Sequence, residues 1–245
     1  MATIDWIYSN ADWLTIFVIT TLFTIITIRY YTKKDQYESE PKWRLLWALF
    51  LGVVSVGPAL LFSSLLLIVI PHTYSTVIVA PIAEEIAKGL FVLWLARNNH
   101  FDGPLDGLIY GAMVGTGFAY VENILYAMNA LGTSGAVGGI FLAGFRSVFE
   151  IIGHPLYTGT FGIGVGASKV GLNYRRILRL LEAMALHSFW NSSSWFGINQ
   201  FLAYLIVTAV AIIILHFEVK RVTKLDKKAY ERGYYDNEDV SYLGN

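Results

Sequence analysis

Long apolar stretches alternate with short connections in this sequence, and the connections hold nearly all of its Lys and Arg residues. A helix needs about 20 apolar residues to cross the hydrocarbon core of a bilayer, and these stretches are near that length or longer. Charged residues make up 15% of the sequence, against about 25% in ordinary soluble domains. The sequence therefore predicts an all-α, polytopic membrane protein. We expect about seven transmembrane helices, at residues 13–28, 45–70, 76–96, 105–130, 139–168, 177–196 and 201–217.

The basic residues also indicate the orientation of the chain. Every Lys and Arg except Lys88 and Arg146 lies in or beside the connections after the first, third and fifth expected helices, or in the tail after the seventh. Lys and Arg accumulate in the cytoplasmic loops of membrane proteins. We therefore expect the N-terminus outside and the C-terminus in the cytoplasm, with a transmembrane domain at residues 1–217 and a cytoplasmic tail of basic and acidic residues at 218–245.

The net charge and the cysteine count narrow the function. The formal net charge is zero, which gives no indication of a nucleic-acid partner. Because the sequence has no cysteine, disulfides, thiolate metal ligands and cysteine nucleophiles are excluded. The first residues show neither the basic segment nor the cleavage site of a signal peptide, so we expect none to be removed.

Three ionisable residues, Glu84, Glu85 and Lys88, interrupt the expected helix at residues 76–96. One charge in the middle of a bilayer costs about 2.5–3.5 kcal/mol on insertion scales, so such residues face protein, water or one another and are functional by default. A purely structural alternative is a Glu84–Lys88 pair at i,i+4 spacing. That pair leaves Glu85, about 100° further round the helix, unexplained. We predict that the two glutamates are catalytic and that one is a general base; the sequence leaves open which one.

Two further expected helices carry polar residues at membrane depth. Glu122 and Asn123 lie in the helix at residues 105–130, among glycines and alanines that permit close helix packing. Arg146, Glu150 and His154 follow at four-residue intervals and share one helix face. Arg146 and Glu150 could form a plain ion pair. His154 lies between Gly153 and Pro155, where a broken helix is tolerated if it lines a cavity, so we expect His154 to face water.

The helix expected at residues 177–196 carries His187 and Asn191 on one face. At 1.5 Å per residue, Glu85, Glu122 and His187 lie about 12–14 Å below the outer ends of their helices, so the polar groups could meet in the outer half of the membrane. A carboxylate and an imidazole can activate water, either directly or by binding a metal. Asn191 could donate a hydrogen bond to a tetrahedral oxyanion. This combination indicates hydrolysis inside the membrane.

Two other functions are compatible with the same residues. A proton-coupled membrane carrier also uses chains of Glu and His, and it predicts inverted repeats, which the sequence does not show. A non-catalytic membrane scaffold or receptor predicts that the polar residues tolerate conservative substitution.

The ordered set of these segments resembles the PrsW family of intramembrane proteases, which is distantly similar to the type II CAAX prenyl endopeptidases. The resemblance covers residues 81–191. The family pattern begins with Glu-Glu-x-x-Lys, matched by Glu84, Glu85 and Lys88. The later matches are Asp106-Gly107-Leu108-Ile109-Tyr110-Gly111, Glu122-Asn123, Arg146, His154-Pro155-Leu156-Tyr157-Thr158, and His187 with Asn191.

The resemblance implies proteolysis of a membrane-anchored protein, such as an anti-sigma factor cut near its extracytoplasmic side, by a multi-pass protein of a prokaryotic cell membrane. It also implies that the paired glutamates and a histidine are essential. From the residues and the resemblance together, we expect a catalytic core at about residues 76–196, with Glu84, Glu85, His154, His187 and Asn191 in catalytic roles. Lys88, Glu122, Asn123, Arg146 and Glu150 would support them. A zinc ion held by His154, His187 and Glu122 and a metal-free, glutamate-based mechanism are both open, as are the substrate and the oligomeric state.

Overall fold

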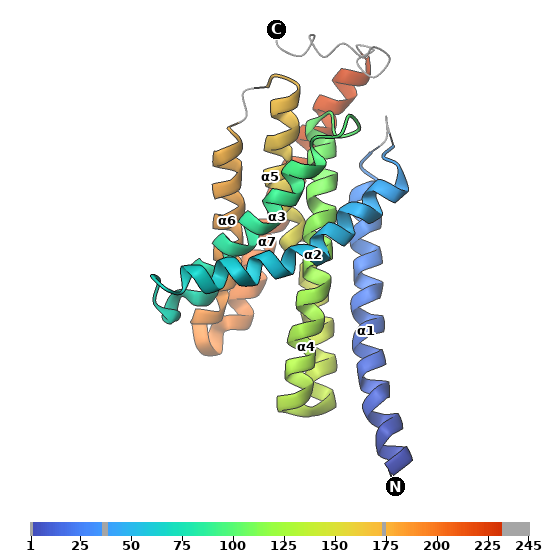
Figure 1. Cartoon of the computed structure of the whole chain (residues 1–245), viewed down its shortest axis with the longest axis vertical. Helices are drawn as coiled ribbons and strands as arrows, with labels where there is room; N and C mark the ends of the chain where they lie inside the picture. Colours follow the sequence, from blue (N-terminus) through green and yellow to red (C-terminus); the bar gives the residue numbers. More distant parts are fainter. Residues whose placement is uncertain (1, 36–38, 173–174, 232–245) are drawn as a thin grey trace.

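The structure, a computed structural model, describes residues 2–35, 39–172 and 175–231. The described residues form helices and contain no β-strand. The α-helices, labelled in Figure 1, are α1 (Ala2–Thr32), α2 (Lys42–Leu66), α3 (Ala80–Leu95), α4 (Pro104–Glu150), α5 (Gly153–Lys169), α6 (Arg176–Ser192) and α7 (Gln200–Glu231). Short helical turns precede α3, namely η1 (His72–Tyr74) and the π-helical η2 (Ser75–Val79), and the 3₁₀ segment η3 (Ser193–Asn199) joins α6 to α7.

Within the described residues, four helical segments are long and apolar enough to cross a membrane: Ala11–Thr32, Lys42–Leu66, Pro104–Lys169 and Arg176–Lys228. Large apolar side chains on these segments point outward, as expected for surfaces that face lipid. The prediction of an all-α membrane protein is confirmed. The number of crossings and the sides on which the termini lie stay predictions, because the last two segments, of 66 and 53 residues, each contain more than one helix.

Two of the three glycines with positive φ among the described residues, Gly135 and Gly197, lie where the chain reverses. Gly135, with φ of 73°, lies inside α4, and Figure 1 shows α4 running to one end of the molecule and returning. Gly197, with φ of 54°, lies in η3, before α7 returns along α6. Glycine adopts positive φ at no steric cost. The first reversal falls between the helices that we expected at residues 105–130 and 139–168.

Close packing of α4 against α5 fixes the position of the first turn of α5. A Cβ added to Gly107, Gly111 or Gly115 would collide with the backbone of α5 at Gly162, Thr158 and His154, respectively. The small residues therefore allow the two backbones to touch, which confirms the packing role predicted for them. Helix α4 ends at Glu150 and α5 begins at Gly153, so the long helix expected at 139–168 is divided just before His154.

Helix α7 continues to Glu231 and so extends beyond residue 217, where we expected the helical domain to end. Val222 is buried and packs into the main core with Tyr31 of α1 and Leu215. Glu218 accepts a hydrogen bond from Arg179 of α6 at 2.9 Å. These contacts explain why the helix continues past residue 217. Residues 232–245 of the predicted tail lie outside the described residues.

Candidate active site

The paired glutamates lie in the second turn of α3 and are both buried, but they have different partners. Oε1 of Glu85 accepts a hydrogen bond from Nζ of Lys88 at 2.6 Å and lies 3.0 Å from Nδ1 of His187. Oε2 of Glu85 accepts one from the hydroxyl of Thr158 at 3.0 Å. Lys88 thus pairs with Glu85 and not with Glu84, so the structural alternative of a Glu84–Lys88 pair is wrong.

Lys88 also determines the tautomer of His154. Its Nζ lies 2.8 Å from Nδ1 of His154, and an ammonium group can only donate, so Nδ1 accepts. In the neutral ring the proton is then on Nε2, which lies 2.9 Å from Oε2 of Glu122 and donates to it. The same Glu122 oxygen accepts a hydrogen bond from Arg146 at 2.8 Å. Arg146, Glu122, His154 and Lys88 therefore form a continuous chain of polar contacts.

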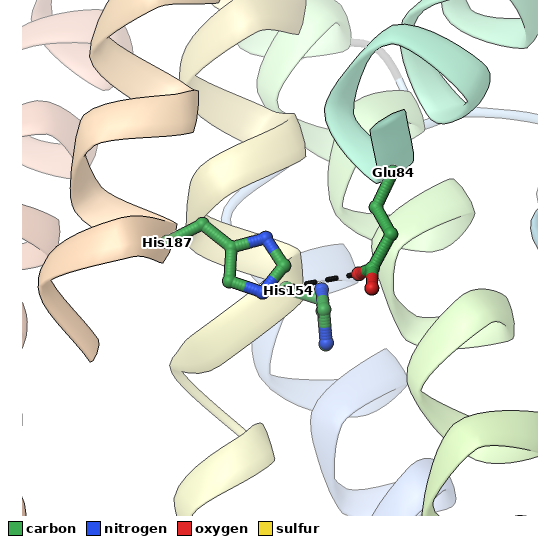
Figure 2. A group of neighbouring side chains, drawn as sticks. All are labelled: Glu84, His154 and His187. Carbon is green, nitrogen blue, oxygen red and sulfur yellow. Dashed lines mark ion pairs between the residues drawn. The ribbon is translucent and has the colours of Figure 1, made fainter. Parts of the chain in front are cut away.

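His187 has the opposite tautomer. Its Nδ1 donates to the Glu85 carboxylate, because a carboxylate can only accept, and Nε2 of the neutral ring keeps its lone pair. That Nε2 lies 3.8 Å from Oε2 of Glu84. The ring is stacked on Tyr157, with centroids 5.1 Å apart. Figure 2 shows Glu84, His154 and His187 converging from three helices, with the 3.8 Å approach of Glu84 to His187 dashed.

Glu84 is the carboxylate that faces open space. Its Oε2 is buried and has no hydrogen-bond partner within the described part of the chain. The residue borders a cavity of about 430 Å³, whose wall also includes Glu122, Arg146, His154, His187 and Asn191. Glu85 and Lys88 lie behind this wall. The cavity confirms that His154 faces an open volume, although its side chain is only 3% exposed.

The remaining predicted residues lie on or behind the same cavity. Asn191 donates from Nδ2 to the carbonyl of Thr76 in η2, at 2.9 Å. Asn123 accepts a hydrogen bond from Nε of Arg146 at 2.8 Å and is almost fully buried. The side chain of Glu150 lies outside the described part of the structure, so the predicted Arg146–Glu150 pair is untested.

The residues around Glu84 fit a zinc ion in part. One carboxylate oxygen of Glu84 and one ring nitrogen each of His154 and His187 lie within 4.8 Å of one another, and these are ligand types of zinc. The unpartnered Glu84 oxygen suits a cation. A carboxylate on the other nitrogen of His187 is the usual outer support of a metal-bound histidine. His154 fits only if Lys88 or Glu122 gives up its contact.

We predicted Glu122 as the third metal ligand, but the structure places Glu84 in that group. The reason is that Arg146, in the returning part of α4, and His154 of α5 already contact Glu122.

Thr158 and Tyr157 were absent from the predicted site residues although they support it. Thr158 lies four residues after His154 and therefore shares its helix face, and this spacing is the signal that could have identified it. Tyr157 has no such signal, because a tyrosine in an apolar helix is usually a packing residue. Tyr126 and Tyr204, which complete one side of the cavity, are likewise ordinary aromatic residues in the sequence.

A helical membrane protein with carboxylate and imidazole groups around one cavity is compatible with a membrane-embedded hydrolase. Comparison with known proteins agrees. The model of the family described as "PrsW family intramembrane metalloprotease" matches residues 40–216. The chain belongs to this family, and it is a peptidase of a prokaryotic membrane.

Individual relatives extend the match. Protease PrsW of Geobacillus kaustophilus is 30% identical over 156 residues, which are 62% of this chain and 66% of the relative. Protease PrsW of Bacillus subtilis is 29% identical over 174 residues, 69% and 76% of the two chains. Protease PrsW of Clostridioides difficile is 27% identical over 244 residues, 95% and 96% of the two chains. No solved structure matches the chain significantly. Family membership favours hydrolysis over the carrier and scaffold alternatives.

Proposed function

We propose that this chain cleaves a membrane-anchored protein within the outer half of the membrane, and that Glu84 is the group that activates water. One observation carries the assignment of Glu84. The side chain of Glu84 borders the cavity, and its Oε2 is a buried acceptor that has no hydrogen-bond partner among the described residues and lies 3.8 Å from the unprotonated nitrogen of His187. A buried acceptor left without a partner costs about 1–3 kcal/mol, so its retention supports a functional role.

In this proposal the other residues prepare Glu84 and its surroundings. Glu84 takes the proton of a water molecule in the cavity as the water attacks the peptide carbonyl carbon, and it later returns that proton to the leaving amine. Glu85 is a positioning residue, since it fixes the ring of His187 with Nε2 toward the cavity. Asn191 donates to the developing oxyanion by exchanging its present acceptor, the Thr76 carbonyl.

A metal can take part through the same residues. Zinc held by Glu84, His154 and His187 would supply Lewis-acid activation of water and polarise the substrate carbonyl. Without a metal, the pair of Glu84 and His187 offers the acceptor for the water proton. The two variants of the mechanism differ in metal content and are tested separately below.

The topology that we propose has seven crossings, with the N-terminus outside and the C-terminus in the cytoplasm. At 1.5 Å per residue, the 66-residue segment Pro104–Lys169 would measure about 100 Å as one helix, roughly three bilayer cores. Its reversal at Gly135 supports two crossings. The basic residues at one end of the helices support the orientation. The site then lies on the extracytoplasmic side, which suits an anti-sigma-factor-like substrate.

The experiment is a cleavage assay in cells. Single-span anti-sigma factors of a host bacterium, each carrying a cytoplasmic tag, are co-expressed with the wild-type chain or with Glu84→Gln, and the tagged fragments are resolved by electrophoresis. We expect cleavage of a substrate by the wild type and none by the variant. Glu231→Gln is the matched control, because that carboxylate is exposed at the end of α7. If a folded Glu84→Gln protein cleaves the substrate as well as the wild type does, Glu84 is not the group that activates water.

A further inference from the structure

A second cavity, of about 320 Å³, lies where α2 begins and α3 ends. None of its lining residues borders the active-site cavity. In Figure 1 the start of α2 and the end of α3 both lie in the upper half of the view, near the end where α7 finishes. The wall combines indole rings with basic side chains: Trp43, Arg44, Trp47, Trp94, Arg97 and Tyr110 are among its residues.

The two arginines of this cavity have no acidic partner within the described residues, where neither forms an ion pair. Arg44 is partly buried and its guanidinium lies over the ring of Trp43, 4.6 Å from the centroid. Its Nε is buried and has no hydrogen-bond partner among the residues that the structure describes. Tyr110, on the wall of the cavity, donates a hydrogen bond to the buried acid Glu40. The cavity therefore presents one buried donor without a partner and two guanidinium groups that form no ion pair with the described residues.

The indole rings form an exposed frame around these charges. Trp43, Trp47 and Trp94 are 63%, 41% and 47% exposed, and the rings of Trp47 and Trp94 lie 6.2 Å apart. Tryptophan at the end of a membrane helix is an ordinary interface anchor. An aromatic belt, however, does not require an arginine with a buried, unpartnered nitrogen in its centre, and such a group costs free energy unless something binds it.

We propose that this cavity is a specific binding site for the phosphate headgroup of an anionic phospholipid. The guanidinium groups of Arg44 and Arg97 would bind the phosphate oxygens through charge-assisted hydrogen bonds. The indole rings would contact the glycerol and the first methylenes of the acyl chains. Basic pockets between membrane helices bind anionic headgroups elsewhere, and the position at the end of two such helices places the phosphate at headgroup level. Inorganic phosphate shares the recognised chemistry, so the test separates the two sources.

The test uses the full-length protein, purified in detergent and stripped of lipid. Native mass spectrometry then measures binding of phosphatidylglycerol, with phosphatidylcholine as the zwitterionic reference. The test variant is Arg44→Gln with Arg97→Gln. The control variant, Lys33→Gln with Lys224→Gln, removes two exposed basic residues outside the cavity. Both variants lose two positive charges, so a general effect of charge appears equally in each.

We expect one phosphatidylglycerol per wild-type chain, bound about tenfold or more tightly than phosphatidylcholine. The arginine variant should lose that preference, and the lysine control should keep it within about twofold. If both variants lose the preference for phosphatidylglycerol equally, or if the wild type binds the two lipids equally well, the cavity is not a specific lipid site. Displacement of the lipid by millimolar inorganic phosphate would instead overturn the lipid assignment in favour of a soluble anion.

Discussion

Glu84 and Glu85 are adjacent in sequence, but the carboxylate of Glu85 is held by Lys88, His187 and Thr158, whereas Oε2 of Glu84 has no hydrogen-bond partner. The two side chains are identical, but they point in different directions from α3. Glu85 therefore positions its neighbours, whereas Glu84 faces the cavity. This division predicts different phenotypes for two chemically identical substitutions.

Glu85→Gln should destabilise the protein strongly. The substitution removes the counter-charge of Lys88, which is fully buried, and breaking a buried ion pair by removing one partner costs about 3–5 kcal/mol. Glu84→Gln should change stability by less than about 1 kcal/mol, because Glu84 Oε2 loses no hydrogen bond. Thermal unfolding in detergent measures both. Equal losses of stability in the two variants would contradict the division of roles.

Thr158 offers a milder test of the same network. Thr158→Val keeps the shape of the side chain but removes the hydrogen bond to Oε2 of Glu85. We expect a loss of about 1–3 kcal/mol, because the buried acceptor is left unsatisfied. Catalytic rate should fall while substrate affinity is kept, since Thr158 acts only through Glu85 and His187. Thr158→Ser restores the hydroxyl and should recover most of the rate; a serine variant as slow as the valine variant would point to packing.

Metal content separates the two forms of the mechanism. If zinc is used, the purified chain should contain about one zinc ion, and Glu84→Gln and His187→Ala should each lose it. Arg146→Gln should keep it, because Arg146 contacts Glu122 rather than the group formed by Glu84, His154 and His187. Elemental analysis of folded protein is the measurement. Wild-type activity after complete chelation of metal would establish the metal-free, glutamate-based form.

The tight contact of α4 with α5 should be sensitive to a single methyl group. Gly115→Ala places a Cβ against the carbonyl of His154, where it collides with backbone atoms. The helices must separate, so we expect a loss of about 1–3 kcal/mol and reduced activity through displacement of His154. Gly57→Ala in α2 is the matched control, because its added Cβ meets nothing within 4 Å. That control should be neutral or slightly stabilising, as alanine is the better helix former.

The sequence predicted the helical membrane fold, and it named several polar residues that the structure brings to one cavity, because both depend on pattern. Apolar length and basic loops mark helices, and i,i+4 spacing places residues such as His187 and Asn191 on one face. Helix rotation depends on packing that no local pattern records. For this reason the sequence left the two glutamates undivided, kept a Glu84–Lys88 pair open as an alternative, and named Glu122 as the third metal ligand, whereas the described residues group Glu84 with His154 and His187.

The end of α7 shows a second limit of the pattern. We expected the helical domain to stop at residue 217 because polar residues follow, yet buried Val222 and the Arg179–Glu218 pair continue the packing to the next turns. Two apolar residues spaced three apart in a charged segment, Val219 and Val222, were the available signal. A hydropathy average over a membrane-length window hides them.

The proposed topology can be tested directly because the chain has no cysteine, so a single introduced thiol is the only one to react. Ser134→Cys, beside the reversal at Gly135, should be outside, and His100→Cys, between α3 and α4, should be in the cytoplasm. In intact cells, a membrane-impermeant maleimide should label the first variant and not the second. Permeabilised cells should give labelling of both, and the unsubstituted chain provides the blank. Labelling of His100→Cys but not Ser134→Cys in intact cells would reverse the orientation and place the active site nearer the cytoplasm.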